Sequence, residues 1–243
     1  MKKRDKIIII SASIAVGLAA LTFIVYYCAV TLPKEKQAEE WRVTMQNYYD
    51  TKLAFFAEEN EQYDDYEVDV AFIGDSLTDG YDVNVSYPQY TVVNRGVSGD
   101  TTFGVEERLK VSLYDLKPKV VVMLIGANNL DTMFENYEDI LIALRDNLPQ
   151  SEIVLVSLTS MSMEWGKNNQ LAAYNNVKIK LLAEKYGYKY VDLYSALLDV
   201  ETGELRAEYT VDGGHQTTAG YAVFTNTITP VLEELDCLKK PEE

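Results

Sequence analysis

Residues 120–125 have the sequence Val120-Val121-Val122-Met123-Leu124-Ile125, which contains no polar or charged side chain. Such an unbroken apolar run of strand length is typical of a strand that a parallel sheet buries on both faces. Gly126 follows directly, and the chain then becomes polar at Asn128 and Asn129. This stretch therefore predicts an α/β fold built around a buried parallel sheet.

The same pattern repeats on both sides of this strand. Four further short apolar runs predict strands at residues 68–73, 91–94, 153–157 and 188–192. Helical spacing of apolar residues predicts helices at residues 104–114, 137–147, 168–186 and 217–235. Strands that alternate with helices indicate a parallel sheet covered on both faces, and such sheets bind ligands at the carboxyl ends of their strands.

The amino-terminal part of the chain has a different composition. Four basic side chains within residues 1–6 precede an uncharged stretch of 24 residues, 7–30. As a helix this stretch would extend roughly 36 Å, enough to cross a bilayer core of about 30 Å. It is longer than the apolar region of a cleaved signal peptide, about 7–15 residues, and offers no good cleavage site. We expect a single-pass, uncleaved anchor in the cell membrane, with a cytoplasmic tip at residues 1–6 and an extracellular remainder.

Residues 31–66 are predicted to form a helical stalk or linker, and residues 67–243 a single α/β domain. No glycine or proline interrupts the chain between Pro33 and Asn60. Large apolar side chains recur there at helical intervals, namely Trp41, Met45, Tyr48 or Tyr49, Leu53 and Phe56.

Charge and residue counts narrow the functional classes. The chain carries a formal net charge of −16, so it should not bind nucleic acid by electrostatic attraction. Its two cysteines, Cys28 and Cys237, lie in the apolar stretch and near the far end of the chain, and they predict no disulfide framework. The single histidine, His215, excludes metal sites that need two or three histidine ligands.

Residues capable of chemistry follow the first three predicted strands. Ser76, in Gly74-Asp75-Ser76-Leu77, would lie at the start of a helix, where free N–H groups and the helix dipole favour negative charge, as suits a nucleophile. After the second strand, Gly96 and Gly99 could each point a backbone N–H into a cleft. After the third, the Asn128 amide could donate to an oxyanion. Taken singly, each is more commonly an ordinary cap or turn residue.

The histidine occurs in Asp212-Gly213-Gly214-His215, just before the last predicted helix. Imidazole is the usual proton carrier of hydrolytic enzymes at neutral pH, although a lone loop histidine is also an ordinary capping residue. A carboxylate three residues earlier can hold the far ring N–H, which fixes the tautomer and stabilises the imidazolium. Because all these groups fall at strand ends or on this late loop, a parallel sheet would gather them.

Together the four blocks resemble the SGNH, or GDSL, hydrolase family, whose blocks are a G-D-S serine, a glycine, a G-x-N asparagine and a D-x-x-H pair. The resemblance covers residues 69–235 and implies a flavodoxin-like three-layer α/β/α fold with a five-stranded parallel sheet. It also implies that Ser76 is the nucleophile, His215 the general base and Asp212 its orienting partner.

The resemblance further implies an oxyanion hole made of the Ser76 N–H, the Gly99 N–H and the Asn128 side chain, with Gly96 as the alternative glycine. Many members have G-x-N-D in the third block, whereas this chain has Asn129 after Asn128. The variant looks like the platelet-activating-factor acetylhydrolase catalytic subunits and related bacterial esterases. The donor Asn128 is retained, so the departure does not put activity in doubt.

The implied activity is that of a serine esterase that works through an acyl-enzyme and needs no metal or organic cofactor. The outward-facing anchor and the lack of a long apolar lid segment favour short acyl esters on carbohydrate or surface glycan. A lysophospholipid substrate and acyl transfer to an acceptor remain open, while the complete catalytic set argues against an inert binding module. Candidate substrate-binding residues are Asp75 and Trp165, with Met161, Met163, Tyr81, Tyr87 and Tyr90 as further candidates.

Overall fold

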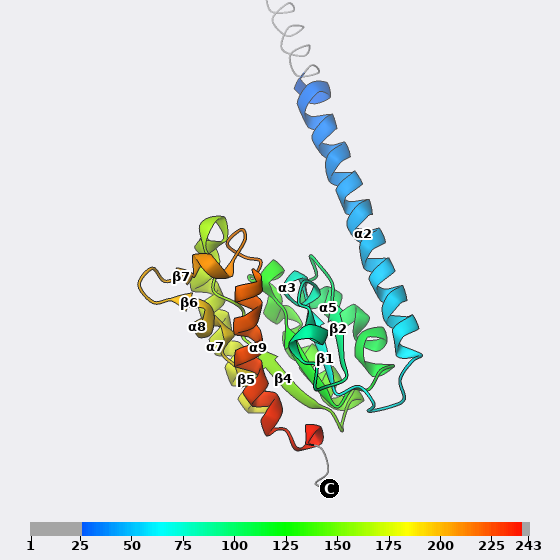
Figure 1. Ribbon diagram of the computed structural model, residues 1–243. Coiled ribbons are helices and arrows are strands. Elements are labelled where there is room, and N and C mark those ends of the chain that lie inside the picture. Colours follow the sequence, from blue (N-terminus) through cyan, green and yellow to red (C-terminus); the bar gives the residue numbers. More distant parts are fainter. Residues whose placement is uncertain (1–25, 240–243) are drawn as a thin grey trace, which may run out of the picture. The chain divides into compact units, whose positions relative to one another are not determined.

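The structure of the protein is a computed structural model that describes residues 26–239 (Figure 1). Its centre is a five-stranded sheet in which neighbouring strands run parallel, in the order β2-β1-β3-β4-β5. The strands are β1 (Val70–Gly74), β2 (Val92–Gly96), β3 (Val120–Leu124), β4 (Glu152–Val156) and β5 (Lys189–Val191). This strand order is that of flavodoxin-like folds, and it confirms the five-stranded parallel sheet that was expected.

Helices cover both faces of the sheet (Figure 1). Successive side chains of a strand point to opposite faces, so the apolar strands present an apolar surface on each face that helices bury. On β1, Ala71 and Ile73 belong to one core, while Val70 and Phe72 belong to the other. The first core is closed by α5 (Thr102–Leu109), α6 (Tyr137–Asn147) and α7 (Asn169–Tyr186). The second is closed by α3 (Ser76–Asp79), α4 (Val83–Ser86), α8 (Leu193–Leu197) and α9 (Thr218–Glu234). The three-layer arrangement is therefore as expected.

Several short elements were not evident in the sequence, because they are too short to show a periodicity. α5 continues into a π-helical turn, η2 (Lys110–Tyr114), so the helix predicted at residues 104–114 changes geometry within its length. An antiparallel hairpin joins β6 (Leu198–Asp199) to β7 (Glu204–Leu205). The 3-10 turns are η3 (Ala127–Asn129), η4 (Met133–Glu135), η5 (Met163–Asn168), η6 (Ala207–Tyr209) and η7 (Asp236–Leu238).

The long helix α2 (Leu32–Asn60) confirms that the segment predicted as a stalk, residues 31–66, is mostly helical, but α2 is divided between two compact units. One unit extends to Asp50, and the other is Thr51–Glu243. In the second unit Phe56 is fully buried and Asn60 is 9% exposed. The α/β domain thus includes the last turns of α2 and begins before residue 67. The prediction placed the boundary too late because apolar spacing alone does not reveal which helical residues find a packing partner.

No helix among residues 26–239 is both long and apolar enough to cross a bilayer. The predicted tip at residues 1–6 and most of the predicted anchor at residues 7–30 lie outside the described residues. Within the described part, Tyr27–Thr31 forms a π-helical turn, η1, that leads directly into α2.

Candidate active site

Ser76 occupies the first position of α3, directly after β1. The turn is tight, because a Cβ on Gly74 would lie 2.2 Å from the carbonyl oxygen of Leu124, so only glycine fits there. Asp75 caps the helix, and its Oδ1 accepts the N–H of Leu77 at 3.0 Å. In the described chain the N–H of Ser76 has no hydrogen-bond partner, as is usual for the first residue of a helix.

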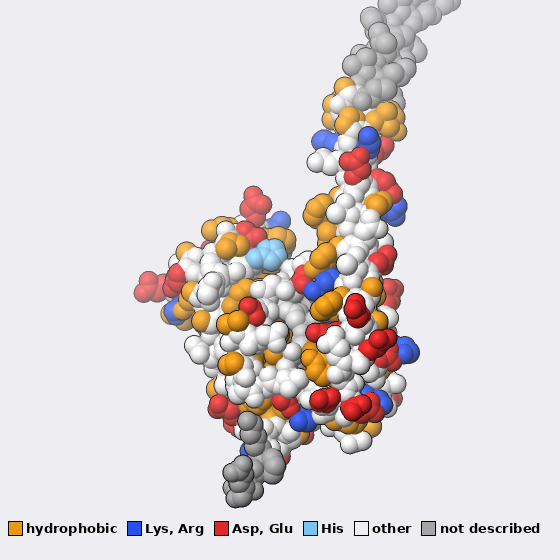
Figure 2. Space-filling model, turned by 45° about the vertical axis from the view of Figure 1, so that its right-hand side comes forward, with side chains coloured by type: hydrophobic (Ala, Val, Ile, Leu, Met, Phe, Trp, Pro, Cys, Tyr) orange, Lys and Arg blue, Asp and Glu red, His pale blue; other side chains and the backbone are white. Residues whose placement is uncertain are grey.

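The fold brings Ser76 and His215 together from opposite ends of the domain sequence. Ser76 Oγ lies 3.0 Å from His215 Nε2, and His215 Nδ1 lies 2.7 Å from Asp212 Oδ2. If Nδ1–H donates to the carboxylate, Nε2 is the acceptor that faces the serine. The histidine, pale blue in Figure 2, lies at the surface of the domain. The three expected residues thus form one hydrogen-bonded chain that can take a proton from Ser76.

Asp212 is held in its charged form. Its Oδ1 accepts the backbone N–H groups of Gly214 (3.0 Å) and His215 (2.8 Å). Burial acts to raise the pKa of Asp212, but hydrogen bonds from the His215 ring and from these two N–H groups outweigh it and lower the pKa to about 2. The carboxylate therefore stays ionised at neutral pH, where it can stabilise an imidazolium.

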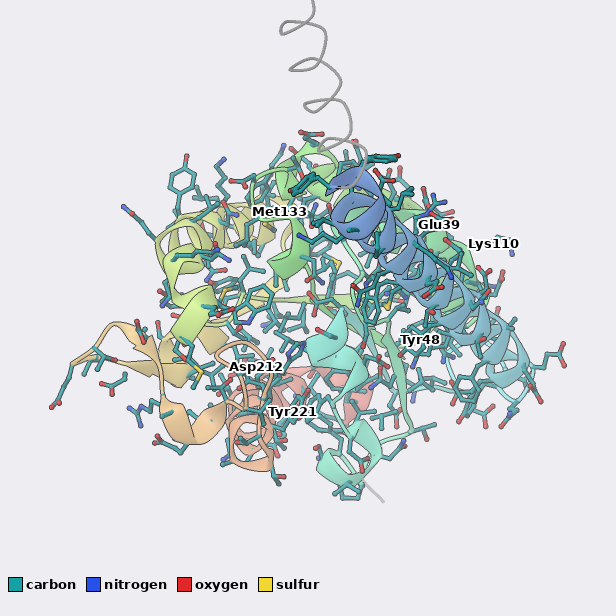
Figure 3. The ribbon with its side chains drawn as sticks, turned by 90° about the horizontal axis from the view of Figure 1, so that it is seen from above. Glu39, Tyr48, Lys110, Met133, Asp212 and Tyr221 are labelled. Atoms are coloured by element: carbon teal, nitrogen blue, oxygen red, sulfur yellow. The ribbon has the colours of Figure 1, made fainter. Side chains whose placement is uncertain are left out.

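The loop at residues 212–215 is fixed to two other parts of the chain. Gly213 has a φ of 92°, and a Cβ there would lie 2.3 Å from the carbonyl oxygen of Ser162. The Ser162 N–H donates to the Gly213 carbonyl at 2.9 Å. Beyond the loop, Tyr221 of α9 donates its hydroxyl hydrogen to the Leu77 carbonyl of α3 at 3.0 Å. Figure 3 labels Tyr221 together with Asp212 of the loop. These contacts hold the histidine loop against the helix that carries the serine.

Candidate oxyanion donors lie at the ends of the first three strands. Gly99 has a φ of 81°, which glycine adopts without strain, and its N–H has no partner among the described residues. Asn128 Nδ2 donates one hydrogen to the Asp100 carbonyl (2.8 Å), which ties the amide to the Gly99 loop and leaves the second hydrogen available. Gly96 lies within β2, and its N–H donates to a side chain of the same strand at 2.8 Å. The arrangement therefore favours Gly99 over Gly96.

Asp75 is almost completely buried, with 1% of its surface exposed. Its Oδ2 has no hydrogen-bond partner among residues 26–239, while Oδ1 caps α3. Burial raises the pKa of Asp75 to about 7; the charge of Asp100 adds to this rise, and the Leu77 N–H and the charge of His215 oppose it. Asp75 borders the pocket described next, but it leaves little surface for a substrate.

A pocket opens beside the serine and the histidine. Its lining comes from the ends of three strands, from η5 and from the histidine loop, namely Asp75, Ser76, Leu77, Ala127, Asn128, Thr159, Met161, Trp165, Gly214 and His215. Trp165 and Met161 therefore lie where they were expected, whereas Met163 is exposed and does not line the pocket. Sequence reasoning missed Leu77, Ala127, Thr159 and Gly214, although Thr159 follows β4 and a search of strand ends would have found it.

The three tyrosines that follow the serine are not part of the pocket lining. Tyr81 and Tyr87 are buried in the second core. The Tyr87 ring stacks on Phe72 with centroids 5.0 Å apart, and the Tyr81 ring stacks on Tyr221 at 5.1 Å. Tyr90 packs against the same core and is partly buried. These rings were candidates for the cleft, but their large apolar faces are used in the core instead.

A second hollow adjoins the pocket and shares Ala127, Asn128 and Trp165 with it. The rest of its lining is mostly polar and consists of Asn129, Leu130, Asp131, Thr132, Asn168 and Leu171. Asn129 is fixed in place, because its Oδ1 accepts the Thr102 N–H (3.3 Å) and its Nδ2 donates to Thr102 Oγ1 (2.9 Å). Asn129, which stands where many family members have an aspartate, thus anchors the segment that carries Asn128 to the start of α5.

Metal-ligating side chains are not grouped in the described part of the chain. Among residues 26–239, no three or more His, Cys, Asp or Glu side chains lie together in a way that could hold a metal ion. Cys237 is a free, exposed thiol near the end of the domain.

Comparisons with known proteins found similar sequences and similar folds. The human platelet-activating factor acetylhydrolase IB subunit alpha2 is 28% identical over 194 residues, which are 74% of this chain and 82% of that protein. The fold resembles a provisionally named platelet activating factor from Streptococcus pneumoniae (TM-score 0.74, 24% identity, 82% of this chain and 99% of that one). It also resembles an acetylxylan esterase from Geobacillus stearothermophilus (TM-score 0.58, 19% identity, 72% of this chain and 98% of that one).

The sequence profile of the GDSL-like lipase/acylhydrolase family matches residues 72–223, which is well over half of the chain. The match begins within β1, just before Ser76, and extends past His215 into α9, so it contains every residue of the hydrogen-bonded chain described above. The protein is therefore a member of the GDSL-like lipase/acylhydrolase family, an enzyme that hydrolyses ester bonds.

Proposed function

We propose that this protein is a serine esterase that removes short acyl groups, acetyl above all, from carbohydrate or surface glycans outside the cell. The observation that carries the proposal is the chain of hydrogen bonds from Ser76 through His215 to Asp212, in which Ser76 and His215 line an open pocket. Such a chain supplies a nucleophile, a proton acceptor and a group that orients that acceptor.

In the first step, His215 Nε2 takes the Ser76 proton while Ser76 Oγ bonds to the ester carbonyl carbon. The Ser76 N–H, the Gly99 N–H and the free amide hydrogen of Asn128 stabilise the resulting oxyanion. Ionised Asp212 stabilises the imidazolium that forms. The tetrahedral intermediate then collapses, the alcohol leaves with the proton from His215, and the acyl group stays on Ser76.

In the second step, water takes the place of the alcohol. His215 removes a proton from water as its oxygen bonds to the acyl carbon, and the same donors stabilise the second oxyanion. Collapse of this intermediate breaks the bond to Ser76 Oγ, which recovers its proton from His215. The carboxylic acid is released, and every group returns to its starting state.

The surroundings of the serine support a small acyl group on a polar alcohol. The hollow next to the pocket offers amide, hydroxyl and carboxylate groups beside the half-exposed ring of Trp165, a mixture suited to hydroxyl-rich ligands. Two of the similar proteins are named for acetyl esters, as an acetylxylan esterase and as an acetylhydrolase subunit. The extracellular location rests on the basic tip and the apolar stretch at residues 7–30.

The test compares Ser76→Ala with wild type for hydrolysis of p-nitrophenyl acetate and for labelling by a fluorophosphonate. The variant should lose both, whereas Ser195→Ala, which removes an α8 hydroxyl that donates to the cap residue Asp192, should keep both. A Ser76→Ala variant that hydrolyses and labels like wild type would refute the assignment.

A substrate screen then separates the competing functions. Release of acid from acetylated oligosaccharides, with little from lysophospholipids, supports the proposal. Preferential release of fatty acid would identify a lysophospholipase. Acyl transfer that replaces acid release when a sugar acceptor is added would identify an acyltransferase.

A further inference from the structure

Arg108 of α5 links the loop after β1 to the loop after β2. Its guanidinium is fully buried, and Nε donates to Asp100 Oδ2 at 2.7 Å, one residue beyond Gly99. Nη2 donates to the Gly74 carbonyl at 3.0 Å, two residues before the nucleophile. Charge-assisted bonds of this kind are strong and directional. One side chain therefore sets the distance between the backbone segments that carry two of the proposed oxyanion donors.

A second buried arginine connects this arrangement to α2. Nη1 of Arg108 donates to the Arg95 carbonyl of β2 at 2.9 Å. The Arg95 guanidinium pairs with Glu59 and donates to Asn60 Oδ1 at 2.8 Å, and both partners belong to the last turn of α2. The Phe56 ring lies 4.8 Å from the Arg95 guanidinium and 6.0 Å from that of Arg108. α2 thus supplies the carboxylate, the amide and the aromatic face beside two buried cations.

A separate contact joins α2 to the other side of Gly99. Lys52 Nζ lies 2.8 Å from Asp79 Oδ1, and these side chains are 22% and 13% exposed. Asp79 Oδ2 accepts the N–H of Ser98 (3.2 Å) and its hydroxyl (2.5 Å). Asp79 is also the last residue of α3, the helix that begins at Ser76. The residues on both sides of Gly99 are therefore connected to the same end of α2. The two sets of polar contacts differ, but both pass beside Phe56, whose ring centroid also lies 5.4 Å from Lys52 Nζ.

We infer that Lys52, Phe56, Glu59 and Asn60 of α2 are positioning residues of the active site, which hold the Gly99 loop and α3 at the spacing that the oxyanion needs. This inference rests on the proposed function, because it takes Gly99 and Ser76 as oxyanion donors. The end of α2 is then part of the catalytic domain's machinery and not only a connection to the amino-terminal segment. Donors must be fixed before the reaction to be effective, and a displacement of about 1 Å at a catalytic group can cost about 10²-fold in rate.

The decisive variant is Lys52→Met in the full-length chain, which removes the charge but keeps most of the side-chain volume. We expect kcat for p-nitrophenyl acetate to fall by about 10-fold to 100-fold with KM nearly unchanged, because the loss acts on the transition state only. Lys52→Arg should restore most of the rate. The matched control is Lys185→Met, which removes an exposed ion pair with Glu138 and should leave kcat unchanged.

A double-mutant cycle with Ser98→Ala tests the route through Asp79. If Lys52 acts through Asp79 and Ser98, the two substitutions should not have multiplicative effects. The fold-loss of kcat in the Lys52→Met/Ser98→Ala double variant should then be much smaller than the product of the fold-losses in the single variants. The cycle of Lys52→Met with Trp165→Ala, measured as kcat/KM on an acetylated oligosaccharide, should be multiplicative, because none of the contacts of this route involves Trp165. Glu59→Gln, which keeps the shape and removes the charge beside Arg95, should also lower kcat.

The outcomes separate this inference from the proposed function. If Lys52→Met and Glu59→Gln keep the wild-type kcat while Ser76→Ala is inactive, α2 does not position the site, and the proposed function stands. A lowered melting temperature with unchanged kcat, measured well below melting, would make α2 a structural support only and would overturn the inference. An active Ser76→Ala variant would overturn both.

Discussion

The two halves of the active site are built in different ways. The acid–base half, Asp212 and His215, lies within four residues of one loop, and both side chains are 45% exposed. The proposed oxyanion half, Ser76, Gly99 and Asn128, is drawn from the ends of three strands, and the segments that carry Ser76 and Gly99 are joined by buried Arg108. A carboxylate can orient an imidazole through local hydrogen bonds, whereas three donors aimed at one oxygen need a scaffold that spans the domain. We therefore expect the halves to respond differently to substitution.

The largest loss of activity should come from substitutions in the acid–base half. His215→Ala should lower kcat by about 10⁶-fold, as loss of the base does in serine hydrolases, and the described domain has no second imidazole to replace it. Asp212→Asn should cost about 10⁴-fold through loss of the correct tautomer. Steady-state turnover of p-nitrophenyl acetate measures both. Turnover of the histidine variant within tenfold of wild type would remove His215 from the mechanism.

The oxyanion half should show intermediate losses. Asn128→Ala should lower kcat by about 10²–10³-fold, with a small change in KM, because the amide acts on the oxyanion and not on the ground state. Asn129→Asp is the matched control, because a carboxylate can still accept the Thr102 N–H and can accept the Thr102 hydroxyl where the amide donated to it, and it should remain close to wild type. Equal losses in the two variants would show that the amide of Asn128 acts through loop structure and not as a donor.

A smaller effect is expected at Trp165, which lines the pocket but belongs to neither half of the site. Trp165→Ala should lower kcat/KM for an acetylated oligosaccharide by about 10-fold, the order that a stacked aromatic contact of about 1.5 kcal/mol contributes. Hydrolysis of p-nitrophenyl acetate should change little, because that substrate has no sugar to place against the ring. Val177→Ala, an exposed apolar residue of α7, provides the control. Equal losses on both substrates would place Trp165 in the acyl pocket.

The smallest effect on turnover is expected from substitution of Asp75. Its expected effect is on the pH dependence of the free energy of unfolding. Its folded-state pKa, about 7, lies above the ordinary value of 3.8. The native state therefore keeps a proton that the unfolded state loses, so this contribution to stability is present below about pH 4 and is lost as pH rises through 7. Burial raises the pKa of Asp100 as well, so Asp100 also makes stability fall as pH rises. The pKa of Asp212 is lowered to about 2 from 3.8, so its effect on stability is confined to pH values below about 4.

Asp75→Asn isolates this contribution, because the amide cannot ionise and can still cap α3. Between pH 5 and pH 8, the melting temperature of wild type should fall more than that of the variant, by an amount that corresponds to a few kcal/mol. Thermal unfolding followed by circular dichroism at several pH values measures the difference. Parallel curves for the two proteins would show that Asp75 is ionised throughout this range.

Much of the fold could be predicted from local pattern. All five predicted strands are present, and their ends differ by at most two residues, as for β1 at Val70–Gly74 instead of 68–73. The helix at Tyr137–Asn147 has the predicted bounds, because its amphipathic spacing is regular and Leu148 and Pro149 end it. The short helices α3, α4 and α8 could not be predicted, since segments of four or five residues owe their form to neighbouring turns and caps.

The sequence by itself determined the alternation of strands and helices, and with it the edge at which Ser76, Gly99 and Asn128 would meet. It also determined the pairing of Asp212 with His215, because their spacing is local. Only the tertiary structure decided that the tyrosines after Ser76 belong to the core and that the end of α2 belongs to the domain. It also showed that Asp75 is buried. These outcomes depend on contacts between distant segments, such as Arg95 with Asn60, which no periodicity or motif records.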